Sequence, residues 1–115
     1  MTTFALVGVG KLGEALLSGL LRSGRPKEQV IAAERYASRA KEIADTYGVP
    51  TADPPDAVAQ ADVVLLAVKP QDMRAALRDI AGSVRPETLV VSMAAGITTK
   101  VLEEELPEGT HCIRV

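Results

Sequence analysis

The chain has 115 residues, of which 47% are hydrophobic and only 3% aromatic, and its formal net charge is −2. This length is typical of one domain, and a core of Ala, Val, Leu and Ile suits a parallel sheet covered by helices. The slightly acidic balance argues against a broad basic surface for nucleic acid or anionic membranes, so any phosphate site must be local.

Targeting and redox signals are sparse. Cys112 is the single cysteine, so an internal disulfide is impossible. The N-terminus lacks a basic segment followed by an apolar run, and no run of about 18 apolar residues occurs anywhere. We therefore expect a cytoplasmic protein with no membrane partner and no nucleic-acid partner.

The first strand and helix enclose a glycine motif. The apolar run Phe4–Val7 leads into Gly8, Gly10 and Gly13, and leucines then recur at helical spacing. Strand, Gly-x-Gly-x-x-Gly and helix form the phosphate-binding turn of dinucleotide folds. The first glycine allows a sharp turn, the second lets a pyrophosphate approach the backbone, and the third lets the helix press against the sheet. A glycine-rich turn without a ligand is the alternative, which this position between strand and helix disfavours.

The remaining elements alternate in the same way. Further strands are predicted at Val30–Ala33, 49–51, 62–68, Leu89–Ser92 and 112–115. Helices are predicted at Ala37–Tyr47, after 53–56, at 73–84 behind Asp72 as a cap, and at 101–106. The segment 62–68, which is continuously apolar after Asp62, is typical of a central strand buried on both faces. This order predicts an α/β fold of Rossmann type, doubly wound, with a mostly parallel sheet and helices on both faces.

Charged residues follow the second strand, where such folds hold the adenosine ribose. Glu34 lies 21 residues after Gly13, the spacing of the acidic residue that binds the ribose 2′-hydroxyl of NAD. Arg35 and Arg39 come soon after and could instead hold the 2′-phosphate of NADP. All three could also be ordinary surface charges, and the residues alone leave this choice open.

Two later strand ends fall on the same edge of the predicted sheet. Ala67-Val68-Lys69-Pro70 follows the central strand, and Ser92 to Gly96 follows the next one. Ligands of open α/β sheets bind along this edge, and small side chains there leave room for a flat cofactor. Lys69 could contact the ligand or simply lie in solvent.

Catalytic groups are scarce. His111 is the only histidine and is expected to have a structural or surface role. Ser18 and Ser23 have no evident base partner, and one cysteine with one histidine cannot build a zinc site. The sequence therefore predicts a cofactor-holding chain with no catalytic residue and no metal.

Three segments together resemble the N-terminal half of pyrroline-5-carboxylate reductase. They are residues 8–20, 67–72 and 90–98, and the resemblance extends over the whole chain. The Ala-Val-Lys-Pro-Gln and Ala-Ala-Gly-Ile blocks are more specific to that family than the glycine motif. The resemblance implies reduction of 1-pyrroline-5-carboxylate to L-proline, the last step of proline synthesis, by hydride transfer from NADPH or NADH.

The resemblance also implies contacts, residue by residue. Pyrophosphate contacts fall in the glycine motif, where the family often has Ala in place of Gly13, and nicotinamide-side contacts fall at the two later strand ends. The family usually prefers NADPH, so NADP is expected over NAD, although Glu34 and Arg35 stand where members commonly have Ser, Asn or Thr. The expected cofactor-binding residues are Val7, Gly8, Gly10, Lys11, Leu12, Gly13, Glu34, Arg35, Ala67, Val68, Lys69, Pro70, Ala94, Ala95 and Gly96.

Length is the largest departure from the family. Its members carry a helical C-terminal domain that forms the dimer and supplies most of the imine pocket. We therefore expect residues 1–115 to be an NAD(P)-binding Rossmann domain cut from a longer, homo-oligomeric reductase, with little activity alone. Two alternatives stay open: another Rossmann oxidoreductase, of hydroxyacid dehydrogenase or deazaflavin-dependent NADP reductase type, or a non-catalytic NAD(P)-binding regulatory module.

Overall fold

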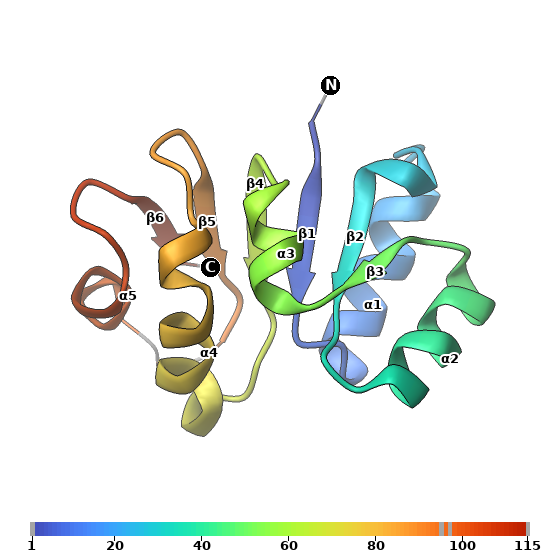
Figure 1. Cartoon of the computed structure of the whole chain (residues 1–115), viewed down its shortest axis with the longest axis horizontal. Coiled ribbons are helices and arrows are strands. Elements are labelled where there is room, and N and C mark those ends of the chain that lie inside the picture. Colours follow the sequence, from blue (N-terminus) through green and yellow to red (C-terminus); the bar gives the residue numbers. More distant parts are fainter. Residues whose placement is uncertain (1, 95, 97, 115) are drawn as a thin grey trace.

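The computed structural model describes residues 2–94, 96 and 98–114, which fold around one six-stranded sheet (Figure 1). All five strand pairs are parallel, in the order β3-β2-β1-β4-β5-β6. The strands are β1 Phe4–Val7, β2 Val30–Ala33, β3 Thr51–Ala52, β4 Val63–Leu66, β5 Leu89–Ser92 and β6 His111–Arg114. The helices are α1 Lys11–Arg22, α2 Ala37–Tyr47, α3 Pro54–Ala59, α4 Met73–Ile80 and α5 Thr99–Glu105. The predicted Rossmann-type α/β fold is confirmed, with a sheet that is parallel throughout.

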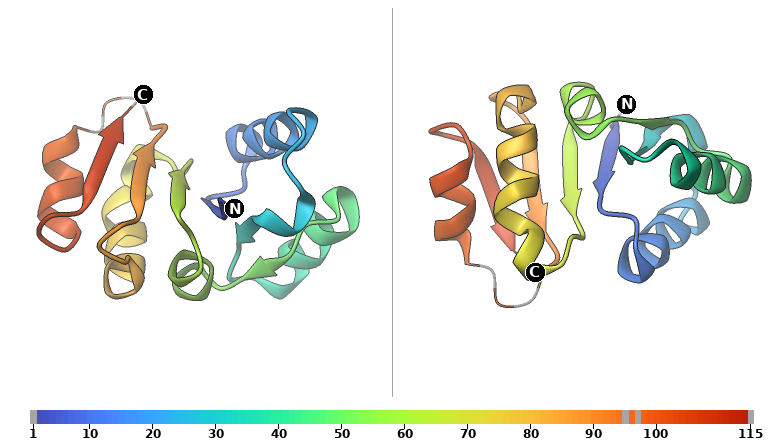
Figure 2. Two further views of the ribbon diagram at one scale, coloured as in Figure 1. Left: turned by 90° about the horizontal axis from the view of Figure 1, so that it is seen from above. Right: turned by 60° about the horizontal axis from the view of Figure 1, so that its bottom comes forward.

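Helices cover both faces of the sheet and create two apolar clusters. One cluster joins Leu17 of α1 and Ile43 of α2 to Leu6 and its neighbours in β1 and β2. The other joins α3, α4 and α5 to the opposite face, with Leu77 and Leu102 fully buried. Seen from above, α1 lies on one side of the sheet and α4 and α5 lie on the other (Figure 2).

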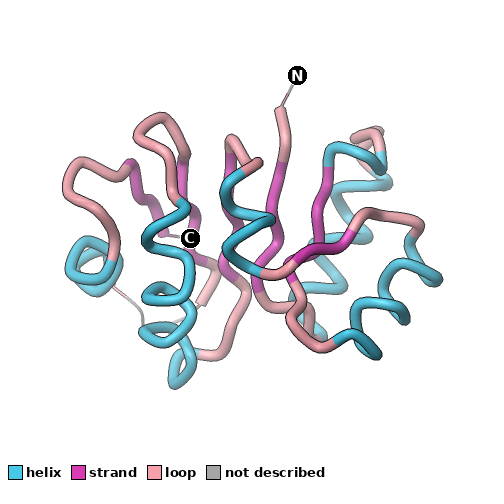
Figure 3. Tube along the Cα trace, viewed as in Figure 1, coloured by secondary structure: helices cyan, strands magenta, loops and turns pink. Residues whose placement is uncertain are grey.

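The strand register brings the functional loops to one edge. Val7 pairs with Ala33 on one side and Leu66 on the other, and Leu66 pairs with Ser92. Because neighbouring parallel strands end level with each other, the loops that follow them gather at the same edge (Figure 3). The chain runs from β1 outward through β2 and β3, then crosses to β4, so the strand order reverses between β1 and β4.

The central strand differs from its prediction. Only Val63–Leu66 forms β4, and its burial alternates: Val64 and Leu66 are fully buried, whereas Val63 and Leu65 are half-buried. The expectation of burial on both faces is thus wrong in part. Helices α3 to α5 seal one face, whereas α1 and α2 pack mainly on β1 and β2 and reach β4 only through Leu65.

Two other local predictions need correction. Asp72 is the N-cap of α4 but makes no side-chain capping bond. Its backbone is helical (φ −99°, ψ −6°) because a 3-10 turn over Pro70–Asp72 precedes α4, whereas a capping residue needs extended backbone. The predicted helix 73–84 ends at Ile80 and continues as a 3-10 turn. Within the described ranges, no helix combines the length and apolar character needed to cross a membrane.

Candidate functional site

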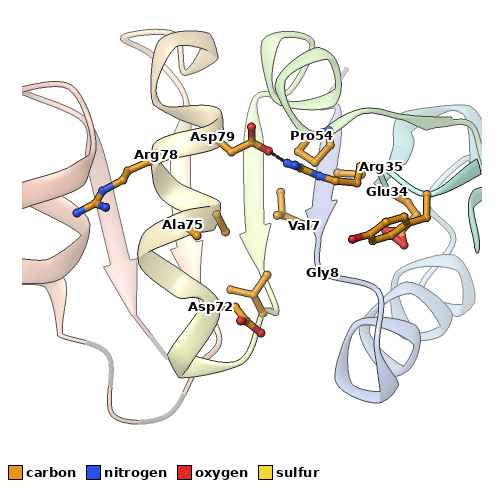
Figure 4. A pocket seen from close by; sticks show the side chains of 13 residues that line it. Val7, Gly8, Glu34, Arg35, Pro54, Asp72, Ala75, Arg78 and Asp79 are labelled. Carbon is orange, nitrogen blue, oxygen red and sulfur yellow. Dashed lines mark hydrogen bonds and ion pairs between the residues drawn. The ribbon is translucent and has the colours of Figure 1, made fainter.

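A cavity of about 800 Å³ opens where the strand order reverses, at the carboxyl ends of β1, β2 and β4 (Figure 4). The Ala67 N–H donates to the Val7 carbonyl at 2.8 Å and extends the pairing of β1 and β4 to the cavity floor. The start of α3 and one side of α4 complete the walls. Open α/β sheets bind ligands in this crevice, because the adjacent loops diverge to opposite faces there.

The first turn of the cavity depends on Gly8. Its φ of +90° lies in the region that side chains disfavour. A Cβ on Gly8 would lie 2.7 Å from Val68 Cγ1 and 2.9 Å from the Ala67 carbonyl carbon. The backbone after β1 therefore approaches the end of β4 as closely as its atoms permit.

The other two glycines of the motif differ in the space around them: Gly13 is tightly enclosed, and Gly10 is open. A Cβ on Gly13 would collide with the Gly8 carbonyl oxygen, so the Ala common in the resembled family would force the loop to shift. A Cβ on Gly10 would meet no described atom within 4 Å. The space beside Gly10 is therefore open, as a ligand approaching the backbone requires.

The start of α1 offers backbone donors beside this open space. Gly10 is the N-cap and has no side chain that could bond the first-turn N–H groups, which belong to Lys11, Leu12 and Gly13. Lys11 and Leu12 are exposed, and Leu12 remains 48% exposed although it is apolar. Unbonded N–H groups and the positive end of the helix dipole suit an anion such as a pyrophosphate.

Arg39 of α2 supports this loop from behind. Its Nη2 donates to the Val9 carbonyl at 2.8 Å and lies 3.4 Å from Glu14 Oε2, and its Nη1 pairs with Glu42 at 3.0 Å. Tyr47 donates to the other Glu14 oxygen at 3.0 Å. The Glu42 hydrogen bond raises the pKa of Arg39 above its usual value, against the effect of burial. The structure thus uses Arg39 at the glycine loop and not at the ribose end.

The ribose end of the cavity carries Glu34 and Arg35. Glu34 is half-buried, and its N–H is held by the Ala52 carbonyl at 2.9 Å. Arg35 is exposed and forms an ion pair with Asp79 of α4. Tyr36, the N-cap of α2, lines the same end and is 69% exposed. A carboxylate, a guanidinium and an aromatic ring therefore surround the place where an adenosine would lie.

The predicted residues fall into three groups. Val7, Gly8, Glu34, Arg35 and Val68 line the cavity itself. The second group lies at the N-terminal end of α1 and in the turn after β4: Gly10, Lys11, Leu12, Gly13, Ala67, Lys69 and Pro70.

The third group follows β5, and its described members, Ala94 and Gly96, do not line the cavity. Ala94 is nearly buried, and Gly96 is exposed with a φ of +80°. Ala95 lies outside the described residues.

Sequence reasoning missed one whole wall of the cavity. Ala75, Ala76, Arg78 and Asp79 of α4 line it, together with Tyr36 and Pro54. The small side chains of Ala75 and Ala76 on a helix that follows the central strand were the only available signal. Their place opposite Arg35 depends on how α4 packs, which no local pattern encodes.

Side chains with conventional catalytic chemistry are not gathered here. His111 is exposed on the edge strand β6, which β4 and β5 separate from β1 and its glycine loop. Burial raises the pKa of the Cys112 thiol, so it is a poor nucleophile at neutral pH. In the part of the chain that the structure describes, no three His, Cys, Asp or Glu side chains cluster as metal ligands would.

Known proteins share this architecture. The family model described as "NADP oxidoreductase coenzyme F420-dependent" matches residues 3–96. Pyrroline-5-carboxylate reductase of Mycobacterium leprae is 42% identical over 119 aligned positions, which cover 99% of this chain and 40% of that enzyme.

Solved structures agree with that match. A pyrroline-5-carboxylate reductase from Coxiella burnetii superposes with a TM-score of 0.88 and 26% identity over 98% of this chain and 43% of that one. The Streptococcus pyogenes enzyme gives 0.83 and 30% identity over 98% and 41%. The chain thus spans about 40% of the length of the curated relatives it matches.

Proposed function

Because the chain belongs to the family of coenzyme F420-dependent NADP oxidoreductases, we propose that it is the dinucleotide-binding domain of a pyrroline-5-carboxylate reductase. The proposed reaction is the reduction of 1-pyrroline-5-carboxylate to L-proline. The observation that carries this proposal is 42% identity to such an enzyme over nearly the whole chain. We further propose that residues 1–115 form one part of a longer two-domain reductase, which the 40% coverage of that relative supports.

The geometry of the crevice suits a dinucleotide. Its volume of about 800 Å³ accommodates an adenosine, and the open space beside Gly10 lies next to unbonded helix N–H groups. We propose that Gly8, Gly10, Lys11 and Leu12 hold the pyrophosphate, and that Glu34 and Arg35 hold the adenosine ribose. The nicotinamide side is proposed to rest on Ala67, Val68, Lys69, Pro70, Ala94, Ala95 and Gly96.

The chain's own contribution to the reaction is binding and orientation. A bound nicotinamide supplies the hydride, and an iminium carbon is already electrophilic. The residues of this domain therefore need to fix the dinucleotide along the sheet edge, so that its reactive face is presented outward from β4 and β5. Small side chains at Ala67 and Ala94 keep that edge clear. Such positioning alone can account for a large share of a rate enhancement.

One assay separates this proposal from its alternatives. The 115-residue chain is titrated with NADPH and NADH, and the full-length gene product is assayed with 1-pyrroline-5-carboxylate. We expect saturable binding by the chain and substrate-dependent oxidation of the coenzyme by the full-length protein. Binding without turnover of any imine or hydroxy acid would favour a regulatory module, and turnover of a hydroxy acid alone would favour a dehydrogenase.

The choice between NADPH and NADH is proposed to depend on Arg35 and Glu34. We expect Arg35→Ala to weaken NADPH by about tenfold and NADH by less than about twofold, because a guanidinium binds a phosphate far more strongly than a hydroxyl. Glu34→Ala should change the ratio the other way. Dissociation constants from calorimetry measure both ratios. Equal losses of the two coenzymes in Arg35→Ala would mean that this arginine does not meet a 2′-phosphate.

Arg39 is proposed to position the glycine loop for both coenzymes. A cation that donates to the Val9 carbonyl polarises the same peptide group whose N–H belongs to Gly10. Arg39→Met should therefore weaken NADPH and NADH alike, by about tenfold, and leave adenosine binding unchanged. Lys41→Met, a cation-to-Met change on the exposed side of α2, serves as the control. Unchanged affinities, or loss of one coenzyme only, would contradict this role.

Two expectations stay predictions for the intact protein. The first is a cytoplasmic location, which cell fractionation tests. The second is a homo-oligomer, which light scattering on the full-length product tests. The first follows from the targeting and membrane signals considered in the sequence, and the second follows from the resemblance to the reductase family.

A further inference from the structure

An ion pair crosses the ribose end of the cavity. Arg35 follows β2, and Asp79 lies 44 positions later on α4, yet their side chains meet (Figure 4). Arg35, Tyr36, Pro54 and Asp79 line both the large cavity and a second one of about 370 Å³. The pair therefore forms part of the boundary between the two cavities, where an adenosine ribose would have to lie.

Asp79 has few other partners for its charge. The neighbouring Arg78 also lines the cavity, but its guanidinium extends toward α5 (Figure 4), where its Nε donates to both Glu105 oxygens at 3.1–3.2 Å. Asp72 lies at the far end of the cavity, beside the start of α4, and Glu34 is the carboxylate on the opposite wall. Arg35 is thus the cation that Asp79 engages, and Asp79 is the anion that holds Arg35.

We infer that Asp79 is a specificity-determining residue that biases this site against a phosphorylated ribose by competing for Arg35. The inference rests on the proposed coenzyme site. A 2′-phosphate must share or take the guanidinium from Asp79, and its own negative charge is repelled by that carboxylate. An unphosphorylated ribose meets neither obstacle, since its 2′-hydroxyl is uncharged and can bond Glu34.

The size of the effect of Asp79 on coenzyme affinity depends on how exposed the ion pair is to solvent. The side chain of Arg35 is 54% exposed and that of Asp79 is 31% exposed, so water and salt screen their interaction. A partly exposed charge pair alters an equilibrium by about two- to fivefold. Asp79 therefore tunes the coenzyme ratio and does not decide alone whether a dinucleotide binds.

The test is Asp79→Asn, which keeps the shape of the side chain and removes its charge. We expect NADPH affinity of the 115-residue chain to rise about two- to fivefold, with NADH changed by less than about 1.5-fold. In an Arg35→Ala background the same substitution should have a clearly smaller effect on NADPH, because the competition is then gone. Asp56→Asn is the matched control, because Asp56 is an exposed carboxylate on α3 that lines neither cavity.

The possible results separate the role of Asp79 from the proposed coenzyme site. An unchanged coenzyme ratio in folded Asp79→Asn would overturn the inference. A loss of NADPH affinity would also overturn it and would mean that Asp79 orients Arg35 toward the phosphate. A wild-type chain that binds neither coenzyme would instead refute the proposed function, and the inference with it. Circular dichroism of each variant shows whether the fold is kept.

Discussion

Gly10→Val is expected to abolish dinucleotide binding while the chain stays folded. The position is open, since a Cβ there would meet no described atom within 4 Å, and its backbone is extended (φ −91°, ψ −155°). A valine side chain therefore fits the fold but fills the space that the pyrophosphate needs. We expect at least about 100-fold weaker binding of both coenzymes, equivalent to about 2.7 kcal/mol.

Gly19→Val is the matched control for this variant. Gly19 lies on the same helix, is exposed, and also has no described atom within 4 Å of a Cβ. It stands two turns beyond the N-terminal end of α1, so binding should be unaffected. Thermal unfolding and calorimetry on both variants separate stability from affinity. Undiminished NADPH affinity in folded Gly10→Val would contradict the pyrophosphate assignment.

Gly8→Val is expected to unfold the domain or destabilise it severely. Its φ of +90° is unfavourable for a β-branched residue, and its Cβ would lie 2.9 Å from backbone atoms Ala67 C and Val68 N, which cannot move without breaking the sheet. Strain and overpacking together should reduce the free energy of unfolding by about 3 kcal/mol or more, a large part of the total stability of a domain of this size.

Gly24→Val separates the two causes of that loss. Gly24 has a similar φ of +98° but open space around its Cβ. This control should lose only the conformational part, about 1–2 kcal/mol. Urea denaturation of both variants measures the difference. Equal losses at the two positions would mean that the close approach of β1 to the end of β4 is not what requires Gly8.

Local patterns predicted most of the fold. The apolar runs at Phe4–Val7, Val30–Ala33 and Leu89–Ser92 are strands with those bounds, and Ala37–Tyr47 is a helix as its spacing indicates. These segments are set by periodicity and by glycine or proline at their ends. The run at 62–68 was overestimated because apolar residues also line the crevice beyond the last paired strand residue.

The candidate site divides in the same way. The glycine loop could be predicted because the glycine motif lies between an apolar strand and a helical pattern. The charged residues after β2 could be predicted because they stand at a fixed spacing from that motif. The wall formed by α4 could not, since Asp79 meets Arg35 only through the packing of a helix 44 positions away in the chain. Arg39 was found as a cation that could hold a 2′-phosphate or lie on the surface, whereas tertiary contacts with Val9 and Glu14 hold it at the glycine loop.

The most direct test follows backbone amide signals of the labelled chain during titration with NADPH. The account predicts saturable shifts, largest at Gly8, Gly10, Lys11 and Leu12, with a second group at Glu34 and Arg35. Titration to saturating coenzyme without shifts in the turn between β1 and α1, or with shifts confined to another surface, would contradict it.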